Sequence, residues 1–126
     1  MSNAPSVLFG LVPLIRATVN SAATGALTTT VTADDSGTMF VSWTTGTHVY
    51  TLPAVADGKG KCWLFYQAES TTTVKIYCST ACIVGGDTTN TYATSASYMG
   101  DCAMIVGDGT YYYMISLAGT WTVASS

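Results

Sequence analysis

The residues Cys62-Trp63-Leu64-Phe65-Tyr66-Gln67 form the most hydrophobic strand-length stretch in the middle of the chain. Glycines at positions 58 and 60 precede this stretch, and the turn-like sequence Glu69-Ser70-Thr71-Thr72 follows it. Six residues rich in aromatic side chains and bounded by turn signals are typical of a β-strand. Because apolar and polar side chains do not alternate, we expect a central strand buried on both faces, with the Cys62 thiol in the core.

The next segment, residues 73–78, alternates regularly. Val74 and Ile76 are expected on one face of a strand, and Lys75 and Tyr77 on the other, because successive side chains of a strand point to opposite sides. Runs rich in Thr and Val, separated by clusters of Gly, Asp and Ser, recur along the chain and are read as strands and turns. The expected strands are residues 27–32, 38–43, 48–52, 62–67, 73–78, 82–84, 102–106, 110–117 and 120–123.

About eight or nine short strands at spacings of roughly ten residues predict an all-β fold, an antiparallel β-sandwich or barrel of the jelly-roll or tulip-like kind. No segment combines a 3.6-residue period with helix caps, so we expect almost no helix. Gly107-Asp108-Gly109 predicts a tight hairpin turn, because Asp-Gly tolerates positive φ angles. Residues 88–97, rich in Thr, Ser, Asn and Ala, are expected to form a polar loop.

The first 26 residues differ from the rest and are interpreted as an extended N-terminal arm before a β-domain of residues 27–126. Residues 7–15 read VLFGLVPLI, and apolar side chains exposed on an arm usually mark a binding surface. The alternative is that this run is a first core strand. It lacks a preceding basic region and is interrupted by Pro13, unlike a signal peptide. The candidate partner-binding residues are Val7, Leu8, Phe9, Leu11, Leu14 and Ile15.

Charged residues make up only 9% of the 126 residues, against roughly 25% in a typical globular protein. The basic residues are Arg16, Lys59, Lys61 and Lys75, and the net charge is −3. Four scattered basic residues are too few for an electrostatic surface that binds nucleic acid or an anionic membrane. A nine-residue apolar run is also too short to span a bilayer, which needs about 20 residues. So little charge suits a subunit that packs against neighbours.

No group of residues in the sequence has the pattern of an enzyme site. His48 is the single histidine and lies in an expected strand, and Glu69 is the single glutamate and lies in a turn. The aspartates all fall at turns, where a carboxylate that accepts local N–H groups has a sufficient structural role. We therefore expect no enzymatic activity and no cofactor.

The four cysteines are Cys62, Cys78, Cys82 and Cys102. Two disulfides would allow three pairings. A zinc site with four cysteines usually needs two close pairs, and only Cys78 and Cys82 are close in sequence. Buried thiols, or one or two disulfides, are the better interpretation, and we expect no metal site.

Three stretches resemble small virion structural proteins of tailed bacteriophages: LTTTVTADDSGT at residues 27–38, TLPA at 51–54, and GDGTYYY at 107–113 followed by the late Trp121. The resemblance covers residues 27–123. It implies a capsid decoration (cement) subunit, a homotrimer that binds the major capsid protein on the capsid exterior. Such a virion protein would be assembled in the host cytoplasm.

Two other classes of function remain open. The first is a receptor- or glycan-binding knob of a phage tail or head fibre, which would use aromatic loop residues and the Thr- and Asn-rich residues 87–97. A knob normally hangs from a long shaft, for which 126 residues leave no room, so the cement interpretation is favoured. A small hydrolase ranks last, because no acid, base and nucleophile are grouped in the sequence.

Overall fold

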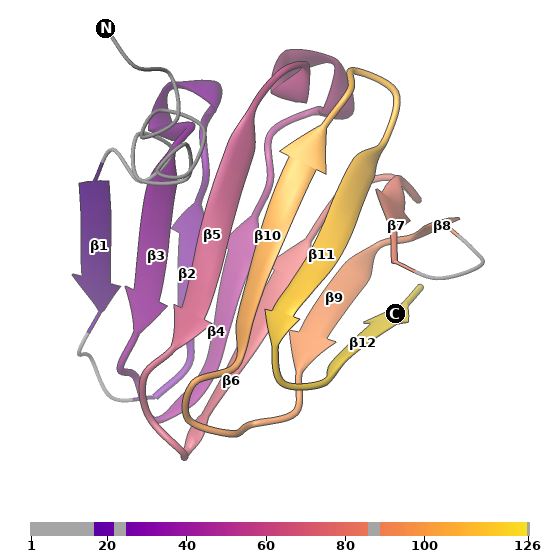
Figure 1. Ribbon diagram of the computed structural model, residues 1–126. Coiled ribbons are helices and arrows are strands. Elements are labelled where there is room, and N and C mark those ends of the chain that lie inside the picture. The colour runs from indigo at the N-terminus through magenta and orange to yellow at the C-terminus, as the bar shows by residue number, and fades with distance from the viewer. Residues whose placement is uncertain (1–16, 22–24, 86–88, 126) are drawn as a thin grey trace, which may run out of the picture.

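The computed structural model describes residues 17–21, 25–85 and 89–125. It confirms an all-β fold in which two open sheets lie face to face as a sandwich (Figure 1). In spatial order, the seven-stranded sheet consists of β1 (Ala17–Ser21), β3 (Thr38–Ser42), β5 (Cys62–Gln67), β10 (Cys102–Gly107), β11 (Tyr112–Ala118), β7 (Ile83–Val84) and β8 (Thr89–Asn90). The five-stranded sheet consists of β12 (Trp121–Ala124), β9 (Tyr92–Ser95), β6 (Thr72–Tyr77), β4 (Gly46–Thr51) and β2 (Leu27–Thr30).

The first half of the chain winds between the two sheets. Strands β1 to β6 alternate from one sheet to the other, so each of the first four pairs in parallel with the strand two places further along. Ala17 is opposite Thr38, 21 residues later, and Gly46 is opposite Thr72, 26 residues later. The expected antiparallel pairing therefore holds only in part. Strand β10 pairs antiparallel with both β5 and β11, and β9 pairs antiparallel with β6 and β12.

Two expected irregular segments contain strands. Residues 88–97 were expected to be a loop, but β8 and β9 lie within them. In β9 the side chains alternate, with Ala93 and Ser95 buried. These side chains are small enough to fit between the two sheets. Ala17–Ser21, assigned to the arm, forms the edge strand β1. The six apolar residues between Val7 and Ile15 lie outside the described residues, so their role stays a prediction.

Within residues 17–21, 25–85 and 89–125, the helical content is two short 3₁₀ turns, η1 (Ala33–Asp35) and η2 (Val55–Gly58). This agrees with the expectation of almost no helix. Among the described residues, no helix has the length and hydrophobicity needed to cross a membrane.

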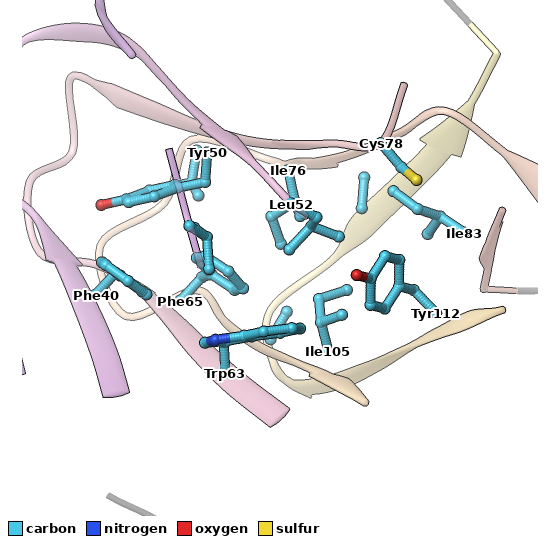
Figure 2. Packing of buried hydrophobic residues seen from close by; sticks show 14 of the residues in the cluster. Phe40, Tyr50, Leu52, Trp63, Phe65, Ile76, Cys78, Ile83, Ile105 and Tyr112 are labelled. Atoms are coloured by element: carbon cyan, nitrogen blue, oxygen red, sulfur yellow. The ribbon is translucent and has the colours of Figure 1, made fainter. Parts of the chain in front are cut away.

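The core lies between the sheets, and Figure 2 shows its aromatic side chains. Phe65 is fully buried, and its ring centroid lies 5.6 Å from that of Phe40 and 5.0 Å from that of Tyr50. Val74 and Ile76 point inward, as the alternation predicted. Strand β5 is central, as expected, but Cys62 is half-exposed. The expected burial of Cys62 is wrong, because only the face of β5 that carries Trp63 and Phe65 points into the sandwich.

The chain makes a close contact where η2 meets β10. A Cβ atom on Gly107 would overlap the carbonyl oxygen of Gly58, and one on Gly58 would overlap the ring of the buried Tyr112. Both positions therefore require glycine. The hairpin between β10 and β11 turns where expected, with Gly109 at a φ of 92°.

Candidate functional site

The outer side of the seven-stranded sheet is hydrophobic across four neighbouring strands. The register places Met39, Leu64, Met104 and Ile115 in one row across β3, β5, β10 and β11. The residues on both sides of this row complete a surface that we call the apolar face. Its members are Met39, Val41, Trp43, Cys62, Leu64, Tyr66, Cys102, Met104, Val106, Tyr113, Ile115 and Leu117. None of these residues is charged.

Several side chains of the apolar face are open to solvent. Trp43 is 48% exposed, Ile115 42% and Leu117 51%, whereas Val41 and Leu64 between them are largely covered, at 8% and 9%. Single exposed apolar side chains are common on soluble proteins, whereas a contiguous apolar patch usually marks an interaction site. The apolar face is therefore the candidate functional site.

The outer side of the other sheet has a different composition. One row across its five strands contains Thr28, Val49, Lys75, Thr94 and Thr122. Hydroxyl groups and a charged amine interact well with water, so this side has the composition of a solvent-facing surface. The contrast shows that the two exposed faces of the sandwich suit different environments.

One end of the apolar face is hollowed into a pocket of about 380 Å³. The pocket is lined by Met39, Val41, Trp43, Tyr66, Ala68 and Met99. These side chains offer hydrocarbon, sulfur and aromatic surface, and their polar groups are the Tyr66 hydroxyl and the Trp43 indole N–H. The pocket suits an apolar side chain better than a sugar or another strongly polar group, which would need several hydrogen-bonding partners.

A projecting tip borders this pocket. Tyr98 and Met99 are 71% and 64% exposed, at the turn that leads into β10. The turn is held by Asp101, which is almost fully buried and whose Oδ2 accepts N–H groups from Ala96 at 3.1 Å and Tyr98 at 3.3 Å. Ser97 contributes a hydroxyl contact of 2.6 Å to Thr73 of β6. The two apolar side chains are therefore presented on a braced backbone.

Two free thiols lie on the apolar face. Cys62 and Cys102 are both half-exposed, and their strands β5 and β10 are neighbours. Burial raises the pKa of the Cys102 thiol, so this thiol stays protonated at neutral pH and is a poor nucleophile. The other two cysteines form the disulfide Cys78–Cys82. Within the described part of the chain, no group of three or more His, Cys, Asp or Glu side chains is placed to hold a metal ion.

His48 lies inside the sandwich in a network of neutral groups. Its Nε2 is 2.8 Å from the Thr29 hydroxyl, and its Nδ1 is 3.2 Å from the Ser42 hydroxyl, which also contacts the Tyr50 hydroxyl at 2.6 Å. Desolvation lowers the pKa of His48 from 6.5 to about 4, so the ring is neutral at pH 7. Ser42 is 0% exposed and His48 1%, so this serine–histidine pair is closed to substrate and has a structural role.

The tyrosine run Tyr111-Tyr112-Tyr113 divides as alternation predicts. Tyr112 is buried and donates its hydroxyl to the Pro53 carbonyl at 2.8 Å, whereas the flanking tyrosines are exposed. Tyr113 donates its hydroxyl to Oδ2 of Asp108 at 2.8 Å, and this bond raises the pKa of Tyr113. The other oxygen of Asp108 accepts the N–H groups of Thr110 and Tyr111. Asp108 thus has the turn-stabilising role expected from the sequence.

The apolar face was not recognised as a site from the sequence, although a signal was present. In β5, apolar or aromatic side chains occupy both alternating sets of positions, Trp63 and Phe65 on one side and Leu64 and Tyr66 on the other. Such a strand was interpreted as buried on both sides. A strand on the surface of a subunit that is covered only after assembly has the same pattern.

No protein-family model matches the chain, and comparisons with curated proteins and with solved structures find no significant similarity.

Proposed function

We propose that this protein is a structural subunit of a bacteriophage virion, a capsid decoration (cement) protein on the exterior of the head. In this proposal it is a homotrimer that binds the major capsid protein and needs neither a cofactor nor nucleic acid. The observation that supports the proposal best is the apolar face, a broad uncharged surface on a chain with 9% charged residues.

A cement subunit stabilises a shell because it binds the assembled state and not the free capsid protein. Its binding free energy then adds to the stability of the particle. Each copy needs to contribute only a few kcal/mol, because many copies act on one shell. The described residues offer apolar area and backbone groups for such contacts rather than charge pairs.

The proposed anchor to the capsid is the segment with Val7, Leu8, Phe9, Leu11, Leu14 and Ile15, which lies outside the described residues. The segment contains no charged side chain, so main-chain pairing with an exposed strand edge of the capsid protein would suit it. Removing residues 1–16 leaves β1, which begins at Ala17, intact. This deletion is therefore expected to give a folded protein that no longer binds capsids.

The test uses phage heads that lack this protein, prepared with and without the purified chain added back. We expect heads with the protein to release DNA at a higher temperature, at both low and high salt, because apolar contacts are little affected by ionic screening. Equal DNA release with and without the protein would contradict the cement proposal. Loss of binding in moderate salt would contradict the apolar mechanism alone.

A glycan-binding knob remains the second candidate, because one observation favours it. Tyr111 and Tyr113 are both exposed, with ring centroids 6.4 Å apart, and a carboxylate lies beside them in Asp108. Aromatic rings next to an acceptor can hold a sugar, although this carboxylate already accepts three hydrogen bonds within its own turn. Binding of labelled host surface glycans that is lost in Tyr113→Ala would support this candidate, and no binding would eliminate it.

A further inference from the structure

We infer that the apolar face is covered by a second copy of this chain, and is therefore the contact that holds the homo-oligomer together. This inference deepens the proposed function by naming the occupant of the face, and rests on it only in taking the protein to be a homo-oligomer. The contact with the capsid would then be left to other parts of the molecule. Three properties of the described residues favour a second copy.

The first property is charge. The chain has seven acidic residues and four basic residues, yet none lies among the twelve side chains of the apolar face. When two such faces meet, no like charges are brought together and no ion is desolvated without a partner. A surface without charge is complementary to itself, whereas a contact with a charged partner would favour residues of opposite sign.

The second property is size. Four strands spaced about 4.8 Å apart, each with six residues rising about 3.3 Å, give a face of roughly 400 Å² in plan. The corrugated side chains, together with the tip formed by Tyr98 and Met99, add further area. Two such faces give roughly 800 Å² in plan before the side-chain relief and the Tyr98 and Met99 tip are counted, which is below the total of about 1,200 Å² buried in the smaller specific interfaces. The face is therefore of a size for a weak contact that depends on protein concentration.

The third property is shape. The exposed tip of Tyr98 and Met99 and the pocket beside Trp43 lie at the same end of the face, and Met99 belongs to both. A neighbouring copy can insert its Tyr98 side chain into this pocket while its own pocket receives one. Because the projection and the pocket belong to one patch, the contact can close into a small oligomer instead of extending into a fibre. The hydrogen bonds of Asp101 hold the tip in advance, which reduces the ordering cost of association.

The test compares two substitutions that add the same positive charge to opposite sides of the sandwich. Ile115→Lys places the charge on the apolar face, and Thr122→Lys places it on the outer side of the five-stranded sheet. Both native side chains are exposed, so both variants should fold. Light scattering should give wild type and Thr122→Lys the same mass, at least twice 13.1 kDa. The Ile115→Lys protein should associate at least about 100-fold more weakly, because its ammonium group would be buried without a partner.

The native Cys62 thiol provides a second readout. Its reaction with a maleimide should slow as the wild-type concentration rises, because association covers this thiol, and should stay fast at all concentrations in Ile115→Lys. A wild-type monomer at 100 µM would overturn the inference, as would an oligomer that Ile115→Lys does not weaken. A monomer with slow labelling that becomes fast after deletion of residues 1–16 would show that the chain covers its own face.

The outcome is independent of the capsid experiment. Self-association is measured in the absence of capsids, so its failure leaves the cement proposal to be tested by DNA release. Conversely, an oligomer held by this face that does not bind heads would support the inference and contradict the cement function.

Discussion

Lowering the pH from 7 to 5 is expected to reduce the free energy of unfolding by about 2 kcal/mol through the protonation of His48. The ring is 1% exposed and stacks on Tyr50 with 4.0 Å between centroids. Its hydrogen-bonding partners among the described residues are the hydroxyl groups of Thr29 and Ser42. A hydroxyl can donate to or accept from the neutral ring. Neither partner carries a negative charge that would stabilise the imidazolium.

The sign follows from the direction of the pKa shift. Burial lowers the pKa of His48 from 6.5 to about 4, so between these values the unfolded chain binds a proton that the folded chain does not. Stability is therefore complete above pH 6.5 and decreases as the pH falls towards 4. Each unit of pKa difference corresponds to about 1.4 kcal/mol, which gives a loss of about 2 kcal/mol at pH 5 and about 3 kcal/mol below pH 4. His48 is the only histidine, so it dominates the window from pH 5 to 7.

The assay is urea unfolding of wild type and of His48→Gln at pH 5, 6 and 7. The glutamine amide can bond to the same hydroxyl groups but does not titrate, so the variant should lose stability at every pH and show almost no slope in this window. The reasoning would be refuted if wild type changed by less than about 0.5 kcal/mol between pH 7 and 5, or if His48→Gln kept the wild-type slope.

Reduction of the Cys78–Cys82 disulfide opens a loop of five residues, and the expected decrease in the free energy of unfolding is about 2 kcal/mol. Urea unfolding with and without reductant measures this decrease. Equal midpoints would contradict the prediction. Gly107→Ala is expected to cost about 3 kcal/mol or more, because its Cβ would meet the carbonyl oxygen of Gly58. Gly60→Ala, where φ is +72° and no atom lies within 4 Å, should cost only about 1–2 kcal/mol. Thermal unfolding of the two variants gives the comparison, and equal losses would show that the contact at position 107 can relax.

The strands themselves could be predicted because their signals are local. Cys62–Gln67 begins and ends where its composition indicates, and the alternation of Val74 and Ile76 gives the correct inward face of β6. The Asp-Gly turn before β11 was also predicted, because a turn that needs a positive φ angle favours glycine at that position.

The pairing of strands could not be predicted in the same way. The residues that connect β3 to β4 resemble those of any turn, although the chain there passes from one sheet to the other. Whether Gly46 pairs with a neighbour in sequence or with Thr72 depends on how the two layers pack. The sequence of a short segment does not determine this packing. The expectation of antiparallel neighbours was therefore wrong for half of the strand pairs.

The candidate site was missed for a related reason. A strand with apolar residues on both sides is consistent with burial within one chain and with burial between chains. Only the arrangement of the layers shows that Leu64 and Tyr66 point out of the sandwich while Trp63 and Phe65 point into it. The Cys62 thiol lies on the same outer side of the sheet as Leu64 and Tyr66, and is partly exposed for that reason.

The winding of β1 to β6 has a consequence for the kinetics of folding. Each parallel pair joins residues 21 to 26 positions apart, so the chain must close a series of sizeable loops before any of these pairs gains a packed neighbour. Folds dominated by such distant pairings reach the native state in milliseconds to seconds, whereas a hairpin such as β10–β11 closes in about 1–10 μs. The β10–β11 hairpin should form early, and the parallel pairs among β1 to β6 should form later. The apolar face spans β3, β5, β10 and β11, so it exists only once the β10–β11 hairpin has joined the parallel strands. Association between copies must therefore follow folding and cannot guide it.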